Sequence, residues 1–212
     1  MNVDVPVSVE LMLEEPSAEV AVRVLVPKII PGVDFTTVAF TSKNELLRKL
    51  PGRLRGCAVG MPFTGSKIVV LVDRDAEDCV RLKKTLDDIV VASGLRTASA
   101  VRCRESGDVL LRIVVEELEA WFFGDVPAIR KAYPRVPANL GDQVKYRDPD
   151  AISGGTWEAL ETVLQRHGYH RERLRKLTAA AEIAPHMDVE NNRSQSFQVF
   201  RDGLRRLVSE EK

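Results

Sequence analysis

Apolar residues along the chain recur at two periods, and the alternation of these periods predicts strands followed by helices. Residues 6–13, PVSVELML, alternate apolar and polar side chains in the way of a half-buried strand. Apolar residues then recur at helical spacing through residues 16–30, behind Pro16, which suits the first turn of a helix. This order of elements favours an α/β fold built around a largely parallel sheet.

The same pattern continues to about residue 125 and completes a four-stranded, mostly parallel sheet flanked by helices. Further strands are predicted at residues 35–40, 68–72 and 109–115. The run at 68–72 is continuous and β-branched, as expected of a strand buried on both faces. Helices are predicted at residues 43–50, closed by Pro51 and Gly52, at 78–91, and from Glu116 to Asp125.

Beyond Asp125 the predicted elements are helices alone, separated by a polar, turn-rich stretch at residues 134–155. Helices are predicted at residues 128–133, 156–168, 172–187 and 196–208. We therefore divide the chain into an α/β core, residues 1–125, and a helical C-terminal extension, residues 126–212. The extension is expected to pack on the core, so that the two form one structural unit.

Acidic residues follow three of the four predicted strands. They are Glu14 and Glu15 after the first strand, Asp73 and Asp75 after the third, and Glu116, Glu117 and Glu119 after the fourth. The carboxyl ends of parallel strands open into one crevice, so these side chains are expected to converge. Carboxylates that gather without a cation raise one another's pKa, and a hard divalent ion such as Mg²⁺ relieves the repulsion. The alternative is that Glu14, Asp78 and Glu116 only favour helix dipoles.

Composition narrows the function classes and the cellular setting. The chain has 31 Lys and Arg against 31 Asp and Glu, which argues against a non-specific nucleic-acid binder while allowing a local basic patch. The three cysteines, at positions 57, 79 and 103, form neither a disulfide framework nor a metal-binding pair, as suits a reducing cytosol. We expect a cytoplasmic protein with neither a signal peptide nor a membrane span.

Several of these residues together resemble the Toprim fold of topoisomerases, primases, recombination proteins and the overcoming-lysogenization-defect nucleases. They are Glu14 with the helix behind it, and the DRD at residues 73–75 after a hydrophobic strand. The segments VEELEAWFFGD, YRDPDAISGGTWEAL and RSQSFQVF are similar to those of one Toprim-like family of bacterial proteins of unknown function. Many relatives carry glycine directly after the glutamate, where this chain has Glu15. Which of Glu14 and Glu15 is the working acid is therefore open, and Glu14 is favoured.

The resemblance implies roles for individual residues. Glu14, Asp73 and Asp75 match the acids that engage Mg²⁺ (or Mn²⁺) and the phosphodiester chemistry. Glu116 and Glu119 are candidates for further metal ligands, and Lys176 matches a lysine on a late helix. Lys176 could stabilise charge on a phosphate, or it could be one solvated lysine in the basic run RERLRK.

Two segments of the C-terminal third could contact phosphate. Arg193, Ser194 and Ser196 offer charge-assisted hydrogen bonds, although a serine here could instead cap the last helix. The glycines of SGGTWEAL precede a helix and could cradle an anion, although a tight turn with Thr156 as the cap is favoured. Trp121 and its aromatic neighbours are expected to pack against the sheet.

The sequence thus predicts a Mg²⁺-dependent, phosphodiester-cleaving protein of the nuclease type that acts on nucleic acid. Genome maintenance or phage defence, together with an ATPase partner, would be its setting. One alternative is a non-catalytic accessory subunit of an ATPase complex. The other is a metal-dependent DxD transferase that handles a nucleotide-linked donor. The sequence leaves open the oligomeric state and whether the substrate is DNA or RNA.

Overall fold

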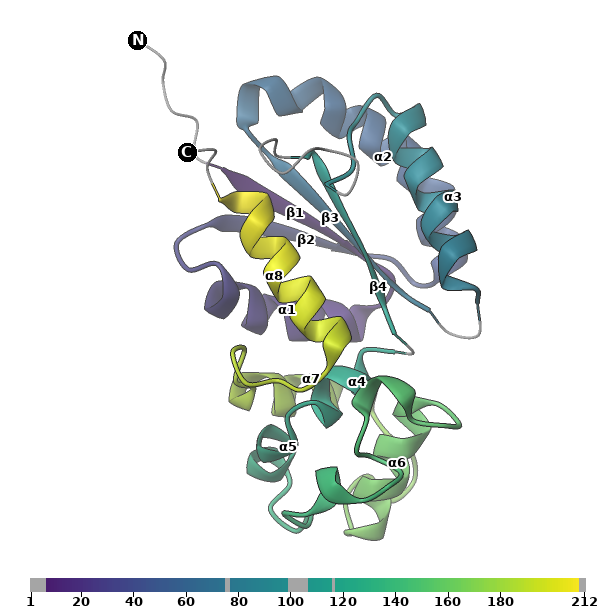
Figure 1. Cartoon of the computed structure of the whole chain (residues 1–212), viewed down its shortest axis with the longest axis vertical. Helices are drawn as coiled ribbons and strands as arrows, with labels where there is room; N and C mark the ends of the chain where they lie inside the picture. Colours follow the sequence, from purple (N-terminus) through teal and green to yellow (C-terminus); the bar gives the residue numbers. More distant parts are fainter. Residues whose placement is uncertain (1–6, 75–76, 99–106, 116, 210–212) are drawn as a thin grey trace.

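Four parallel strands form one sheet in the order β2-β1-β3-β4 (Figure 1). The computed structural model describes residues 7–74, 77–98, 107–115 and 117–209. The strands are β1 (Ser8–Leu13), β2 (Asp34–Ala39), β3 (Lys67–Asp73) and β4 (Val109–Val114). The α/β class with a parallel four-stranded sheet flanked by helices, predicted from the alternating periods, is therefore confirmed.

Helices cover both faces of the sheet, which makes a three-layer arrangement (Figure 1). One face packs against α2 (Lys43–Thr64) and α3 (Cys79–Ala92), and the other against α1 (Pro16–Ile29) and α8 (Gln195–Val208). β3 supplies both cores, because its side chains point alternately to the two faces. In the described part of the chain, no helix is both long enough and apolar enough to cross a bilayer.

Helix α2 is longer than the predicted helix at residues 43–50, because it continues through Pro51 to Thr64. Proline inside a helix removes one backbone hydrogen bond and costs about 3 kcal/mol. Leu46, Leu50 and Leu54 are spaced four residues apart on either side of Pro51, and all three are fully buried. Burial of an aliphatic side chain contributes roughly 1.5–3 kcal/mol, so the apolar stripe outweighs the cost of the proline.

The helices at the end of the core and at the start of the extension gather beyond the end of the sheet where β4 leads into α4 (Figure 1). They are α4 (Glu119–Phe123), α5 (Val126–Ala132), α6 (Thr156–Arg166) and α7 (Lys176–Ile183), with short 3-10 turns at Leu140–Asp142, Pro149–Ala151 and Ala184–His186. The helix predicted at residues 172–187 therefore begins later, at Lys176. Leu174 explains the difference, since its side chain is buried and its N–H donates to Glu161 Oε1 at 2.6 Å.

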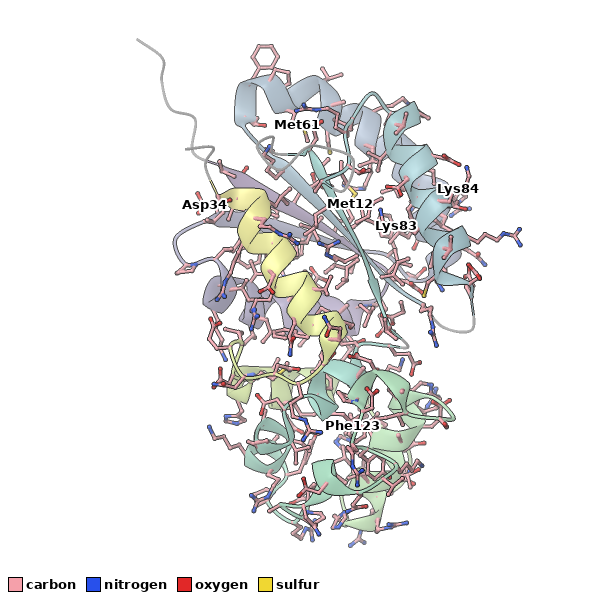
Figure 2. All side chains as sticks on the ribbon, in the orientation of Figure 1. Met12, Asp34, Met61, Lys83, Lys84 and Phe123 are labelled. Atoms are coloured by element: carbon pink, nitrogen blue, oxygen red, sulfur yellow. The ribbon has the colours of Figure 1, made fainter. Side chains whose placement is uncertain are left out.

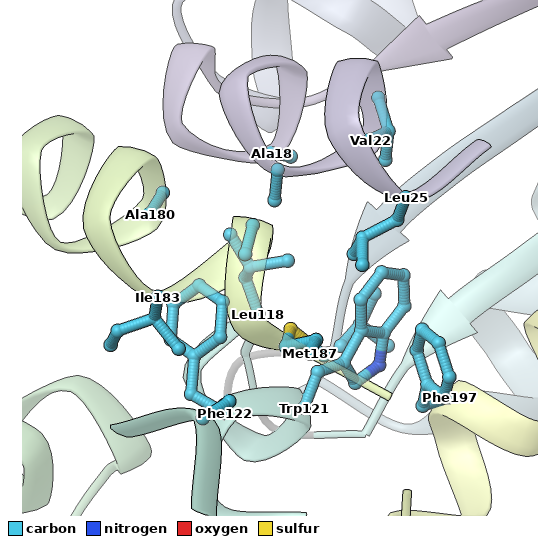
Figure 3. Packing of buried hydrophobic residues seen from close by; sticks show 14 of the residues in the cluster. Ala18, Val22, Leu25, Leu118, Trp121, Phe122, Ala180, Ile183, Met187 and Phe197 are labelled. Atoms are coloured by element: carbon cyan, nitrogen blue, oxygen red, sulfur yellow. The ribbon is translucent and has the colours of Figure 1, made fainter. Parts of the chain in front are cut away.

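The aromatic side chains of α4 pack in the core, as predicted. Trp121 is fully buried, and its ring lies 5.0 Å from Phe200 and 5.2 Å from Phe197 of α8. Figure 3 shows Leu25 of α1 above Trp121, with Phe197 beside it. The indole N–H donates to Ser196 Oγ at 2.8 Å, so the one polar atom of the ring is satisfied.

The start of α8 is held by a carboxylate from a distant turn. Ser194 is the N-cap residue, and its hydroxyl accepts a hydrogen bond from Phe197 N at 3.1 Å. The same hydroxyl donates to Asp150 Oδ1 at 2.7 Å, while Asp150 Oδ2 accepts from the backbone N–H groups of Gln195 and Ser196. The capping alternative for the RSQSF segment is therefore confirmed for Ser194.

Replacing Asp150 should destabilise the docked helix. Asp150→Ala removes the acceptor for three donors, and loss of a capping group of this kind costs about 1–2 kcal/mol. Urea unfolding monitored by tryptophan fluorescence measures this change. Asp142→Ala, a control with the same change of charge on an exposed turn, should stay within about 0.5 kcal/mol of the wild type. Equal stabilities of the two variants would contradict the capping role of Asp150.

Candidate active site

Glu14 and Asp73 lie at the ends of the neighbouring strands β1 and β3, where the helical connections go to opposite sides of the sheet. β1 leads through α1 to β2 on one side, and β3 leads through α3 to β4 on the other, with α1 and α3 on opposite faces. Ligands of parallel α/β sheets bind outside the strand ends at such a switch point. Glu14 Oε2 accepts a hydrogen bond from the backbone N–H of Asp73 at 3.0 Å. The first two predicted site residues therefore lie side by side.

Asp73 is buried at the end of β3, with 8% of its surface exposed. It is in phase with Val69 and Leu71 and so belongs to the face that α1 covers. Burial raises the pKa of Asp73 well above its usual range, and the neighbouring carboxylates of Glu15, Glu14 and Glu119 raise it further. Lys176 opposes this shift. The ionised form of Asp73 therefore needs more positive charge nearby than Lys176 alone supplies.

Glu119 opens α4 and is also buried, with 1% of its surface exposed. Burial is the largest cause that raises the pKa of Glu119 to about 7; Lys176 opposes it, and Glu15 and Glu117 add to it. The atom Oε2 is buried and has no hydrogen-bond partner among the described residues. Such an orphaned acceptor is uncommon in folded proteins, and a bound ion is one of its ordinary explanations.

Lys176, the first residue of α7, supplies positive charge to these acids. Its Nζ lies 3.6 Å from Glu15 Oε2, 3.8 Å from Glu117 Oε1 and 5.7 Å from the centre of the Trp157 ring. Burial alone lowers the pKa of Lys176, but the nearby carboxylates, Glu119 foremost, outweigh this, so that its pKa is raised. The ammonium is therefore charged. We call Glu14, Glu15, Asp73, Glu117 and Glu119 the acidic cluster.

Glu117 connects the acidic cluster to the N-terminus of α6. Its Oε2 accepts hydrogen bonds from Thr156 N and Oγ1, both at 3.1 Å, and from Trp157 N at 3.0 Å. Gly154 and Gly155 have positive φ values of 86° and 88°, which a glycine adopts without strain. Thr156 is thus the first helical residue, and not the cap that the sequence favoured, because the carboxylate of Glu117 occupies that place.

Sequence reasoning noted Glu117 among the acids after the fourth strand but gave it no role in the site. The signals that could have found it are its place two residues before Glu119 and the anion cradle of SGGT. Both are visible in the sequence, but nothing local pairs one with the other, since Glu117 and Thr156 are 39 positions apart.

The remaining predicted residues lie elsewhere or cannot be placed. Asp75 and Glu116 fall outside the described residues. The guanidinium of Arg193 donates to the carbonyl oxygens of Gly141 and Arg147. The side chains of Ser194 and Ser196 are occupied at the start of α8, as described above. Within the described ranges, no hydrogen bond or ion pair joins Arg193, Ser194 or Ser196 to the acidic cluster, so the structure does not bring them to it.

The donor atoms of the acidic cluster are of the type that binds a hard cation, but in this structure they are not arranged around one common position. All are carboxylate oxygens, and Glu119 Oε2 is unpartnered within the described structure. However, a search of the described residues finds no group of three or more His, Cys, Asp and Glu side chains arranged to hold a metal. Lys176 explains why the carboxylates are not arranged around a metal position, because its ammonium attracts Glu15 and Glu117. The open pocket beside Lys67 and Asp108 contains none of the cluster acids.

Compared with models of known protein families, the chain matches the domain of unknown function DUF4276 over residues 13–205. No curated protein and no solved structure matches the chain. The matched range includes Glu14, Asp73, Glu119 and Lys176, so it spans the whole acidic cluster. The resemblance to the Toprim fold stays a prediction, carried by the sequence segments quoted above.

The raised pKa of Glu119 predicts a pH-dependent effect of Glu119→Gln on stability. Between pH 4.5 and about 7 the folded wild type holds a proton that the unfolded chain has released. The wild type therefore loses stability as the pH rises through this window. Glutamine does not titrate, so the variant should gain on the order of 2–3 kcal/mol over the wild type between about pH 5 and pH 8.

Urea unfolding of both proteins in EDTA, at several pH values, measures this difference. EDTA keeps divalent ions from compensating the carboxylates. A stability difference that stays constant with pH, or that falls as the pH rises, would show that Glu119 is not buried beside other acids.

Proposed function

This chain belongs to the DUF4276 family of domains of unknown function, and from that premise we propose that it is a divalent-metal-dependent phosphodiesterase that cleaves nucleic acid at the acidic cluster. One observation carries the proposal: Asp73 and Glu119 are buried together at the switch point of the sheet, and their pKa values are raised beside Lys176. Burial of like charges costs free energy, and proteins keep such clusters chiefly where they bind a cation or perform chemistry.

Glu14, Asp73 and Glu119 are the described residues that would hold Mg²⁺ or Mn²⁺. Asp75 and Glu116 stay predicted as further ligands on the strength of the sequence. A divalent ion in this place supplies Lewis-acid polarisation of a phosphoryl oxygen and a bound water of lowered pKa. A raised carboxylate pKa in metal-free protein agrees with this assignment, because a bound cation would favour the charged forms.

Lys176 is suited to bind a non-bridging oxygen of the scissile phosphate. Its Nζ lies 3.6 Å or more from the nearest carboxylate oxygens. These distances exceed the usual range of N–H···O hydrogen bonds, about 2.7–3.2 Å. The ammonium is thus attracted to Glu15 and Glu117, and no hydrogen bond to another described residue fixes its N–H groups. It can donate them to a phosphate oxygen as negative charge develops there.

Glu117 orients this lysine. Its carboxylate is fixed by three donors at the start of α6, while its other oxygen faces Lys176. A carboxylate that is held so firmly keeps the ammonium at the cluster even when substrate is absent. Glu117 is therefore a positioning residue in this proposal, and Lys176 is the residue that touches the substrate.

Asp73→Asn should abolish metal binding and cleavage. We expect no heat of Mn²⁺ binding in calorimetry and a loss of plasmid nicking of about a thousandfold or more, since several kcal/mol of charge stabilisation disappears. In EDTA the variant should be more stable than the wild type, because a buried charge beside three other carboxylates is removed. Asp88→Asn, on the exposed surface of α3, is the control of equal charge and should keep both activities.

Unchanged Mn²⁺ affinity in Asp73→Asn would contradict the metal site. Mn²⁺ binding by the wild type without cleavage of plasmid or oligonucleotide would contradict the enzymatic proposal and favour the accessory-subunit alternative.

Lys176→Met should separate chemistry from metal binding. The methionine keeps much of the side-chain volume but removes the charge, so nicking at saturating Mn²⁺ should slow by about 10²–10³-fold. Mn²⁺ affinity should persist or increase, because a competing cation has left the cluster. Lys84→Met on α3, whose ammonium pairs with Asp88 at the surface, is the matched control. A variant that loses Mn²⁺ binding together with nicking would contradict a role confined to the phosphate.

A further inference from the structure

The segment that joins α6 to α7 concentrates positive charge in a chain without net charge. From Arg166 to Lys176 it reads RHGYHRERLRK, with four arginines and a lysine against one acid, Glu172. The whole chain balances 31 basic residues with 31 acidic ones. A local field of one sign in a neutral protein steers charged ligands to that place.

The fold of this segment turns three of its arginines toward solvent. Leu174 is buried, and its N–H donates to Glu161 of α6 at 2.6 Å, which fixes the segment to the helical layer. Arg171, Arg173 and Arg175 are exposed. None of these three guanidinium groups makes a hydrogen bond or an ion pair with another described residue.

Several other arginines of the extension hold neighbouring turns in place. Their guanidinium groups bind backbone carbonyls or carboxylates of neighbouring turns, as is the case for Arg135, Arg193, Arg201 and Arg205. A guanidinium carries five donors that fit phosphate and carboxylate oxygens in pairs. Three adjacent guanidinium groups without such partners are suited to an anionic ligand.

The segment ends at the acidic cluster. Arg175 immediately precedes Lys176, whose Nζ lies 3.6 Å from Glu15 and 3.8 Å from Glu117. The acidic cluster by itself repels a polyanion, so a phosphodiester substrate needs positive charge beside the reacting phosphate. The arginine segment supplies this charge directly next to the residue that touches the scissile phosphate.

We infer that Arg171, Arg173 and Arg175 bind successive phosphates of a nucleic acid strand and lead that strand to the acidic cluster. This inference rests on the proposed function and specifies its substrate. A mononucleotide or a small phosphodiester offers one or two anionic groups, which Lys176 and a bound cation already serve. Three further guanidinium groups outside the cluster require a ligand whose charges repeat, and a phosphodiester strand has that property.

Equilibrium binding without divalent ions tests the inference apart from catalysis. A fluorescein-labelled oligothymidine of about 20 nucleotides is titrated with protein in EDTA at several salt concentrations, and anisotropy is followed. Each phosphate contact on a single strand contributes about 0.7 to the slope of log K against log salt. Arg171→Gln/Arg173→Gln/Arg175→Gln should therefore reduce the slope by about 2 and weaken binding at least about tenfold in low salt.

A second triple variant provides the matched control. Arg48, Arg55 and Arg81 are exposed on α2 and α3, over the opposite face of the sheet. Figure 2 shows α3 with its surface lysines Lys83 and Lys84 on that side of the molecule. Replacing Arg48, Arg55 and Arg81 with glutamine removes the same charge, and we expect the affinity to change by less than about twofold. Thermal unfolding of both triple variants checks that each is folded.

Four outcomes would overturn the inference. Equal losses in the two triple variants would show that net charge alone determines binding. No loss in the arginine-segment variant would show that the strand lies elsewhere. Displacement of the oligonucleotide by polyglutamate of equal charge as well as by unlabelled oligothymidine would assign the segment to an acidic protein. Plasmid nicking that persists unchanged in the arginine-segment variant would also overturn it while leaving the proposed function intact.

Discussion

The structure depends on one electrostatic balance, between the ammonium of Lys176 and the carboxylates that gather at the ends of β1, β3 and β4. Asp73 and Glu119 are almost inaccessible to water, and burial beside other carboxylates raises the cost of ionising each of them. Charges in such surroundings interact far more strongly than at the surface. One lysine partly offsets the repulsion, and the remaining excess of negative charge is the basis on which we propose that the site binds a further cation.

This balance gives the C-terminal helices a role beyond covering the sheet. α7 packs on α1 and supplies Lys176, while the N-terminus of α6 accepts the carboxylate of Glu117. The extension thus completes a site whose acids all come from the α/β core. The same segment that places Lys176 carries the exposed arginines, so the charge that we propose for catalysis and the charge that we propose for substrate binding lie on one connection of the chain.

The sequence was most informative where a local pattern determines the structure. The apolar run of β3 ending in Asp73 identified both a strand buried on two faces and its acidic end. The alternating run of β1 identified a strand that ends at Glu14. Prediction from the sequence was less informative where contacts between residues far apart in the chain determine the structure. Pro51 suggested the end of a helix that a stripe of buried leucines continues. Glu117 was given no role in the site, because the helix N-terminus that it occupies is 39 residues away. Phosphate binding by Arg193, Ser194 and Ser196 stays a prediction, and their hydrogen bonds hold α8 and its neighbouring turns.

The central claim is that the acidic cluster binds a divalent cation. Anomalous diffraction from crystals soaked in Mn²⁺ tests this claim most directly, because it locates the ion without reference to activity. We predict one or more anomalous peaks about 2 Å from carboxylate oxygens of Asp73 and its neighbours, with Lys176 moved away from Glu15 and Glu117. A map without a peak at the cluster, in which Lys176 keeps its contacts with both glutamates, would contradict the account.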